Sequence, residues 1–430
     1  MIKWLFGLAA SLALTACVAG EARRDSMNEI AADYVQMQLE IGEREEGYID
    51  AYYGPPEWQA AAKSAPRSVE QLAQEVASLT ARTGDLDVSR MDPLEQRRRA
   101  FLLGQLKAAE TRLRMIRGEK LSFADEAEGL FGVRPELREL SSYDPLLARI
   151  ERLVPGSGPL AERVDAFQNR FNIPKERLQP VFDAAIAECR RRTLRHIPLP
   201  ANEKFTMEFV TGKSWSGYNY YKGNATSLIQ INTDLPIRIS RAVDLGCHEG
   251  YPGHHAYNVL LEQKLAKERG WIEYTVYPLY SPQSLIAEGS ANYGIDLAFP
   301  GEERLAYETA AIYPLAGLPT TDAARYSALL EAMRDLAGAR FTIARDYLEG
   351  RISREQAITL AQKYQLISRP RAEQSIKFTD DYRSYVISYG LGQDMVRAHV
   401  EAAGPSREAR WAAFERLISE PTLPSDLTVR

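Results

Sequence analysis

The chain has 430 residues, of which 45% are hydrophobic and 26% are charged. This composition is typical of a globular protein with one large domain or two smaller ones, and it excludes a chain disordered throughout. The 53 basic and 58 acidic residues are mixed along the sequence and give a formal net charge of -5, so nucleic acid is not an expected partner. Neither a phosphate-binding P-loop nor a G-x-S-x-G motif occurs, which argues against nucleotide and serine-hydrolase chemistry.

The first 16 residues are predicted to be a signal peptide. Lys3 gives them a positive start, and the apolar stretch 4–14 that follows is too short to span a bilayer as a stable helix. Small residues then lead to a cysteine. We therefore expect residues 1–16 to be removed on export.

Residues 14–17, "LTAC", resemble the lipobox of bacterial lipoproteins. The resemblance implies cleavage before Cys17 and attachment of lipid to this residue, and an ordinary secretion signal is the alternative. The residue after Cys17 is Val18, whereas an aspartate at this position would resemble an inner-membrane retention signal. In a host with two membranes, we expect a lipid anchor on the periplasmic face of the outer membrane, followed by a polar tether over 17–26.

Two cysteines remain after Cys17, so no disulfide framework is predicted, although a single bridge between Cys189 and Cys247 is left open. Cys247 directly precedes His248 and would point about 100° away from it on a helix. We interpret Cys247 as a buried small residue, and not as a metal ligand or a nucleophile.

The N-terminal part of the mature chain, residues 27–200, is predicted to be helical. Apolar residues recur at spacings of three and four, and Asp92 with Pro93 marks one confident helix start. A loop is expected at "YYGPPEW", where glycine and two prolines follow one another. The predicted helices cover 28–47, 92–118, 160–172 and 175–195.

Two segments, 204–210 and 225–234, alternate apolar and polar residues and predict a small antiparallel sheet. The second segment is a candidate for binding an extended peptide along its edge, with a purely structural hairpin as the alternative. Further helices are predicted over 238–247, after Gly253, and over 283–298, 322–349, 354–364, 369–402 and 407–420. We expect a mainly α fold with this sheet beside the histidine cluster, in which 201–430 is the catalytic part of one continuous unit, 27–430.

Residues 247–255, "CHEGYPGHH", are similar to the zinc-binding helix motif H-E-x-x-H. In that motif two histidines four residues apart share one helical face, and the glutamate acts as general base. Here Pro252 occupies the second histidine's position, but Pro252 and Gly253 together can loop out two residues. This would return His254 to the register of a ligand beside His248.

His255 is the competing ligand, because seven residues bring it near the same helical face, although about 10 Å further along the axis. We favour His254, since a two-residue bulge is the smaller distortion. His255 would then support a ligand or contact substrate.

A third metal ligand is predicted in "SLIAEGSANYGIDLAF", where Glu288 shares a helical face with Asn292 and Asp296. The helix is apolar, and a metal would remove the cost of burying the carboxylate. Asn292 or Asp296 could orient a ligating histidine through its second ring nitrogen. Three protein ligands leave one position of a catalytic Zn²⁺ for water. The alternatives are a partly exposed helix carboxylate and an incidental cluster of polar residues.

"HEGYPGHH" followed by "AEGSANY" resembles the paired signatures of the bacterial family called domain of unknown function 885, which is related to gluzincin-type zinc metallopeptidases. "YYGPPEW", "SLIQINTD" and "SYGLG" also fit, so the resemblance extends over most of the mature chain. It implies a mostly helical fold with a small sheet at the cleft. His248, His254 and Glu288 would be ligands and Glu249 the base. This chain has Ser290 where many relatives have an aromatic residue. The difference affects the expected shape of the substrate pocket and not the expected metal ligands.

We therefore predict a lipid-anchored zinc metallopeptidase that hydrolyses peptides with a metal-activated water, whose proton Glu249 takes. "FTDDYRSYVISYGLG" offers oxyanion donors, of which we choose Tyr389; packing of these tyrosines at a helix interface is the alternative. The other residues of this segment considered near the site are Tyr382, Arg383 and Tyr385.

Four basic side chains are candidates for binding a substrate carboxylate, or are ordinary surface charges. They are Lys222, Arg369, Arg371 and Lys377. Two other functions stay open: a metal-dependent hydrolase of another amide or ester, and a non-catalytic or structural metal-binding lipoprotein. Glu249 argues against the last, because a purely structural site needs no base beside its first ligand.

Overall fold

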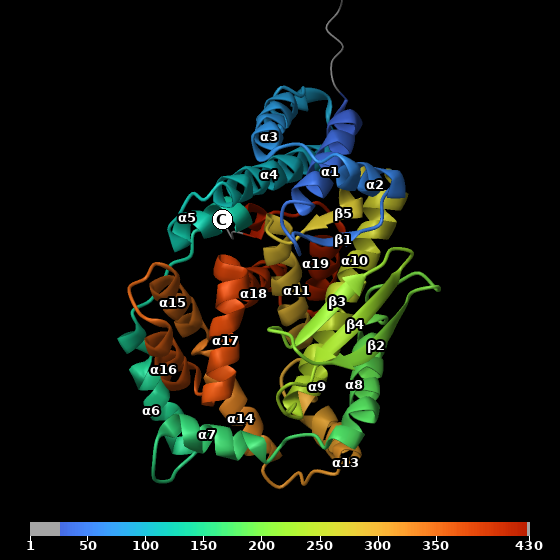
Figure 1. Cartoon of the computed structure of the whole chain (residues 1–430). Helices are drawn as coiled ribbons and strands as arrows, with labels where there is room; N and C mark the ends of the chain where they lie inside the picture. Colours follow the sequence, from blue (N-terminus) through green and yellow to red (C-terminus); the bar gives the residue numbers. More distant parts are fainter. Residues whose placement is uncertain (1–25, 428–430) are drawn as a thin grey trace, which may run out of the picture.

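The computed structural model describes residues 26–427 and confirms the mainly helical fold with a small sheet beside the histidine cluster (Figure 1). The buried hydrophobic side chains form one continuous core cluster. Within the described residues no helix is both long and apolar enough to cross a membrane. The predicted signal peptide, Cys17 and nearly all of the tether lie outside the described residues.

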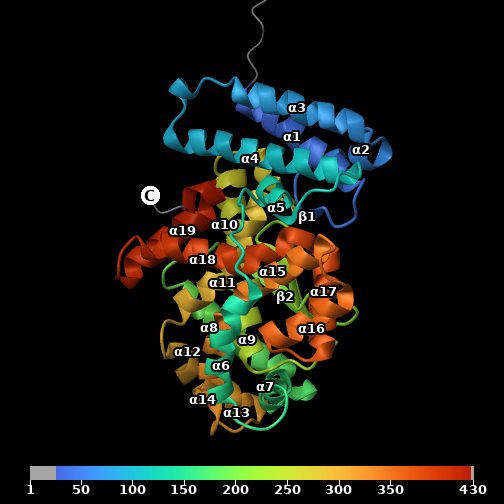
Figure 2. The same cartoon turned by 90° about the vertical axis from the view of Figure 1, so that its left-hand side faces the viewer.

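Three long helices form a layer at one end of the molecule, which both views show (Figures 1 and 2). They are α1 (Met27–Gly42), α3 (Val69–Gly84) and α4 (Pro93–Ile116). Each begins at a capping box, in which Ser26, Ser68 or Asp92 is the capping residue and binds the third residue of the helix reciprocally. Helix α4 starts where Asp92 and Pro93 predict it.

Helix α1 ends at Gly42, earlier than predicted, because the chain then enters the short strand β1 (Ile49–Tyr52). This strand pairs antiparallel with β5 (Val276–Pro278) and so joins the N-terminal layer to the part that carries the histidines. The sequence did not predict either strand, because runs this short show no usable alternation. The remaining helices before the main sheet are α2 (Pro56–Ser64), α5 (Phe123–Phe131), α6 (Asp144–Leu153), α7 (Leu160–Asn169) and α8 (Leu178–Thr193).

The main sheet has three strands, β2 (Lys204–Val210), β3 (Gly217–Tyr221) and β4 (Thr226–Asn232), in the order β2-β4-β3. Strands β3 and β4 pair antiparallel as a hairpin, whereas β2 pairs with β4 in parallel, so the sheet is mixed. Both edges of β4 are therefore occupied. The prediction that an extended peptide pairs with the segment 225–234 is wrong, and the edge that faces the histidines belongs to β3.

Helices follow the sheet to the C-terminus, but two of the long predicted ones are broken. The segment 322–349 forms α14 (Ala323–Arg334) and α15 (Ala337–Leu348), and 369–402 forms α17 (Arg369–Tyr382) and α18 (Ile387–Glu401). The second break lies at Arg383, whose φ of 52° is unusual for a residue other than glycine. The other helices are α9 (Ser240–Leu245), α10 (His254–Leu261), α11 (Pro282–Ala298), α12 (Glu303–Tyr307), α13 (Tyr313–Ala316), α16 (Arg354–Gln365) and α19 (Arg407–Ser419).

Helices α11 and α18 cross closely in the centre of the molecule (Figure 1). A Cβ atom on Gly289 would lie 2.5 Å from backbone atoms of Gly392, so the crossing requires a residue without a side chain. On α11, Glu288 directly precedes Gly289 and Asn292 lies about one turn after it, and on α18 Tyr389 lies one turn before Gly392. The crossing therefore places the tyrosines of the C-terminal segment beside the predicted third ligand.

Candidate metal centre

The chain bends between His248 and His254. Residues Gly246–Gly250 form one turn of π-helix, and the Gly253 amide then donates to the Cys247 carbonyl at 3.1 Å. A Cβ atom on Gly253 would lie 1.8 Å from the His248 carbonyl oxygen, so no other residue fits this bend. The bend brings the Nε2 atoms of His248 and His254 to 3.1 Å from each other.

Glu288 of α11 completes a cluster of three possible ligands. Its Oε2 lies 3.1 Å from His248 Nε2 and 3.6 Å from His254 Nε2. One donor atom of each residue lies within 4.8 Å of the others. Two imidazole nitrogens and one carboxylate oxygen are a ligand set that Zn²⁺ commonly takes in catalytic sites.

Burial and charge in this cluster fit a cation. Glu288 is 5% exposed, and its Oε2 has no hydrogen-bond partner among the described residues. Burial raises the pKa of Glu288, but the two histidines outweigh this and hold it well below its usual range. Burial lowers the pKa of His254, but the Glu288 carboxylate raises it to about 9. The same negative field that favours a proton here favours a metal ion.

Asn292 determines how His248 presents its ring. The Asn292 amide donates to the Tyr389 carbonyl at 2.9 Å, which turns its Oδ1 toward His248 Nδ1 at 3.0 Å. Because this oxygen only accepts, Nδ1 carries the proton and Nε2 keeps its lone pair directed into the cluster. Asn292 was one of two candidates for such a contact, which is the usual support for a metal-binding histidine.

The two tyrosines near Glu288 have different surroundings. The Tyr385 hydroxyl donates to Glu288 Oε1 at 2.8 Å and so fixes the carboxylate. The Tyr389 ring lies nearly parallel to the His248 ring, with centroids 6.2 Å apart, and lines the cavity in front of the cluster. Burial raises the pKa of both hydroxyls well above the usual range, so both are protonated donors at neutral pH.

Glu249 lies beside the cluster in the same cavity, which has a volume of about 490 Å³. Its side chain is buried, and its Oε2 has no hydrogen-bond partner in the described part of the chain. Burial is the main reason that the pKa of Glu249 is raised. Its carbonyl accepts from the Asn219 amide of β3 at 2.7 Å, which holds the edge strand against it. A carboxylate in these surroundings can accept a proton from a water molecule.

His255 is turned away from the cluster, contrary to the prediction that it supports a ligand or contacts substrate. Its Nε2 donates to Glu203 Oε2 at 3.0 Å, and its Nδ1 lies 2.8 Å from the Ser227 hydroxyl. Since its exposed fraction is 0%, His255 reaches neither metal nor substrate.

Two further predicted residues do not contact the cluster. Asp296 lines the same cavity but pairs with Arg334 at 3.0 Å and Arg397 at 2.8 Å, so it does not orient a histidine. Arg383 pairs with Glu126 at 2.8 Å, because the backbone turn at this residue directs it toward α5.

The basic residues named as candidates for binding a substrate carboxylate do not lie together in the structure. Arg371 lines the cavity, where it donates to the Pro236 carbonyl at 2.8 Å. Arg369 and Lys377 of α17 form exposed ion pairs, Arg369 with Glu355 of α16 and Lys377 with Asp381 of α17 itself.

Several residues in the cavity wall were missed by sequence reasoning, among them Asp50, Tyr218 and Arg340. Asp50 of β1 accepts a hydrogen bond from the Tyr218 hydroxyl, and the guanidinium carbon of Arg340 of α15 lies 6.0 Å from the centre of the Tyr389 ring. Each comes from an element remote in sequence from the histidines. No local pattern marks these residues, because only the tertiary fold brings them together.

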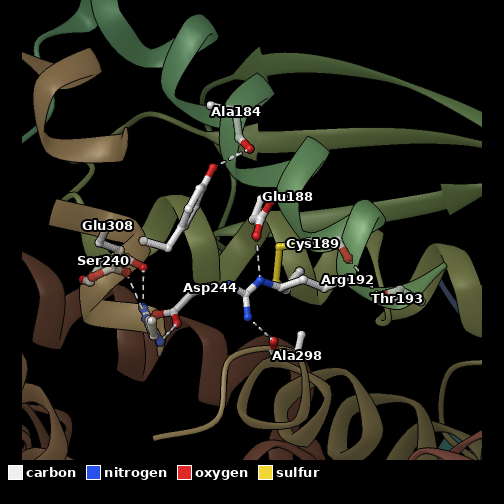
Figure 3. The surroundings of a disulfide bond; sticks show 12 residues. Ala184, Glu188, Cys189, Arg192, Thr193, Ser240, Asp244, Ala298 and Glu308 are labelled. Carbon is white, nitrogen blue, oxygen red and sulfur yellow. Dashed lines mark hydrogen bonds and ion pairs between the residues drawn. A yellow bond between two sulfur atoms is a disulfide. The ribbon is translucent and has the colours of Figure 1, made fainter. Parts of the chain in front are cut away.

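A disulfide joins Cys189 of α8 to Cys247, directly before His248 (Figure 3). The bridge that the sequence left open is therefore present, and Cys247 is not a free buried residue. Arg192 lies beside the bridge and donates to Glu188 and to the Ala298 carbonyl at the end of α11. Helix α8 is thus tied to both segments that carry the possible ligands.

No protein-family model and no curated protein matches the sequence, so the resemblance to the family of unknown function stays an interpretation of its motifs. Among solved structures, a "putative lipoprotein" from Colwellia psychrerythraea is similar with a TM-score of 0.53 and 14% identity, over 84% of this chain and 68% of that one. BsuCP gives 0.42 and 12%, over 91% and 87%. An M32 carboxypeptidase from Deinococcus radiodurans R1 gives 0.33 and 13%, over 90% and 88%. The first shows a shared, mainly helical fold, and the other two are too distant to carry an argument.

Proposed function

We propose that this protein is a zinc-dependent metallopeptidase in which His248, His254 and Glu288 hold the metal and Glu249 is the general base. One observation carries the proposal: two imidazole nitrogens and a carboxylate converge in a cavity, beside a second buried carboxylate with one oxygen that has no hydrogen-bond partner among residues 26–427. A structural zinc site has no need of that second carboxylate.

A zinc ion bound here would supply Lewis-acid polarisation of a carbonyl and would lower the pKa of water. Glu249 takes a proton from the attacking water and delivers it to the leaving amine. Asn292 keeps His248 in its binding tautomer, and Tyr385 keeps Glu288 in place. The Tyr389 hydroxyl is the candidate donor to the developing negative charge.

A peptide is the favoured substrate because of strand β3. Its residues 217–219 line the cavity together with residues 214–216 just before it, and its outer edge has no strand partner in the described sheet. An extended peptide can pair along such an edge through backbone hydrogen bonds, which would bring a peptide carbonyl toward Glu249. Another amide or an ester would use the same cluster but would gain nothing from this edge.

The test compares three preparations of the purified full chain: metal-free, zinc-loaded, and zinc-loaded Glu249→Gln. Each is incubated with a defined mixture of peptides, and the products are identified by mass spectrometry. We expect cleavage only by the zinc-loaded parent chain. Equal cleavage by the metal-free chain would refute the zinc mechanism, and hydrolysis of esters without cleavage of any peptide would establish the alternative substrate class.

We also propose that Cys17 is lipidated and anchors the protein at the outer membrane. The proposal is supported by the lipobox-like residues 14–17 alone. Intact-mass measurement of the protein from membranes is expected to show acyl chains on Cys17. An unmodified mature chain recovered in the periplasmic fraction would contradict the anchor.

A further inference from the structure

Most of the positive charge in the cavity wall is already neutralised by the protein. Arg241 and Arg304 pair with Asp244 at 3.2 and 2.8 Å, and Arg334 pairs with Asp296 at 3.0 Å. All five of these residues line the cavity. These arginines are therefore committed to structural ion pairs.

Arg340 differs, because the described residues give its guanidinium no carboxylate partner. Its Nε is buried and has no hydrogen-bond partner in the part of the chain that the structure describes, and the residue lines the same cavity. Arg340 is partly buried, and its nearest compensation is aromatic: its guanidinium carbon lies 5.0 Å from the centre of the Phe378 ring and 6.0 Å from that of Tyr389. Burial lowers the pKa of Arg340, as expected for a cation that has lost part of its hydration. An anion that entered the cavity would offset this loss.

The position of Arg340 relates it to the metal cluster. Its guanidinium carbon lies 6.0 Å from the centre of the Tyr389 ring, which lies 6.2 Å from the centre of the His248 ring. The guanidinium is thus within about 12 Å of the histidine, and an extended peptide advances about 3.5 Å per residue. Part of this distance is taken up by the bound ligand and by the guanidinium itself, so at most about two residues fit between a bond at the cluster and an anion at Arg340.

We propose that Arg340 binds the C-terminal carboxylate of the substrate, so that the enzyme removes one or two residues from the C-terminus of a peptide. The inference rests on the proposed peptidase function. Water adds across the C–N bond, the new carboxylate stays on the shortened peptide, and the released amino acid or dipeptide keeps the carboxylate that Arg340 holds. A guanidinium suits this role because its planar fork matches a carboxylate with two parallel hydrogen bonds.

The first experiment measures cleavage of one peptide with neutral side chains, prepared as the free acid and as the C-terminal amide. The zinc-loaded full chain is expected to shorten the free acid from its C-terminus and to cleave the amide at least about tenfold more slowly, because a charge-assisted contact is lost. Arg340→Gln should remove this preference, chiefly through KM, and Arg340→Lys should restore part of it. Internal cleavage of both peptides at equal rates would overturn the inference while leaving the peptidase proposal standing.

The second experiment measures binding and does not depend on turnover. The Glu249→Gln chain, loaded with zinc, is titrated with the same two peptides. We expect the free acid to bind at least about tenfold more tightly than the amide, and the double variant with Arg340→Gln to bind both equally. Equal binding of the two peptides to Glu249→Gln alone would overturn the inference even if no peptide is cleaved.

Two other arginines serve as comparisons. Arg345 lies on the same helix but pairs with Asp346 at 2.8 Å, so Arg345→Gln should keep the preference for the free acid. Arg371 also lines the cavity without a carboxylate partner among the described residues, but it contacts the Pro236 carbonyl. If Arg371→Gln removes the preference and Arg340→Gln does not, the assignment to Arg340 is wrong.

Discussion

Two neighbouring histidines, His254 and His255, lie in opposite surroundings. Both ring nitrogens of His255 are bound within the protein, by Ser227 and by Glu203, and the side chain is completely buried. His254 directs its Nε2 toward His248 and Glu288 and is 14% exposed to the cavity. A buried histidine whose two ring nitrogens are both hydrogen-bonded within the protein stabilises the fold. Ring nitrogens and carboxylate oxygens that converge without complete hydrogen bonding can instead bind a metal ion.

The same contrast separates two buried glutamates, Glu249 and Glu203. Glu203 accepts from Arg190 and Tyr251 as well as from His255, whereas one oxygen of Glu249 has no hydrogen-bond partner within the described part of the chain. Substitution of Glu203 or His255 is therefore expected to affect stability, and substitution of Glu249 or His254 to affect catalysis or metal binding. Substitutions in each pair test the comparison.

The largest effect is expected for Glu249→Gln. Turnover should fall about 10³-fold, because the amide cannot accept the water's proton, while zinc content and melting temperature stay unchanged. Steady-state kinetics with elemental analysis and a melting curve measure all three quantities. Turnover retained within tenfold of the parent chain would remove Glu249 from the mechanism.

The next effect is expected for Asn292→Ala, which removes the acceptor for His248 Nδ1. Zinc affinity should fall by about 10- to 100-fold, as is usual when the support of a ligating histidine is lost. Competition with a metal chelator measures the affinity. Gln393→Ala is the matched control, because Gln393 lines the same cavity but contacts Asp296, and its zinc affinity should not change.

A smaller effect is expected for His255→Ala, on stability only. The substitution leaves the buried Glu203 and Ser227 groups without their histidine partner, at a cost of about 2 kcal/mol. Denaturant unfolding should therefore show a lower midpoint. A variant as stable as the parent chain would contradict the structural role of His255.

The smallest effect is a pH dependence of stability. Burial raises the pKa of Glu203, but hydrogen bonds from His255, Tyr251 and Arg190 outweigh it and lower the pKa to about 2. A carboxylate whose folded pKa is depressed stabilises the fold above its unfolded pKa of about 4.3, and this contribution is lost as the pH falls toward 2. Between pH 5 and pH 2, the melting temperature of the parent chain should fall more steeply than that of Glu203→Gln. Parallel curves would contradict this.

The parts of the site that the sequence predicted lie close together in the chain. The bend at Gly253 follows from the missing amide proton of Pro252 and from the spacing of His248 and His254. Glu288 and Asn292 lie one turn apart on a single helix, so their common face follows from helical geometry. Local geometry was sufficient within each of these two pairs, whereas the packing of α11 against the π-helical turn Gly246–Gly250 brings the pairs together.

The parts that were not predicted depend on contacts between remote segments. Ser227 on β4 and Glu203, the residue before β2, bind the two ring nitrogens of His255. Without knowledge of these contacts, the sequence could not decide whether His254 or His255 is the second ligand. Arg340 and Asp50 enter the cavity wall through helix and strand packing alone. The break at Arg383 carries no glycine or proline to mark it, so an apolar pattern that continues through it predicted one helix.

The difference between the two histidines is tested most directly by the zinc content of three proteins: the parent chain, His254→Ala and His255→Ala, each purified with zinc supplied and analysed for elemental zinc. We expect about one zinc per chain in the parent protein and in His255→Ala, and very little in His254→Ala. Loss of zinc in His255→Ala with retention in His254→Ala, or no zinc in the parent chain, would contradict the assignment of the metal centre.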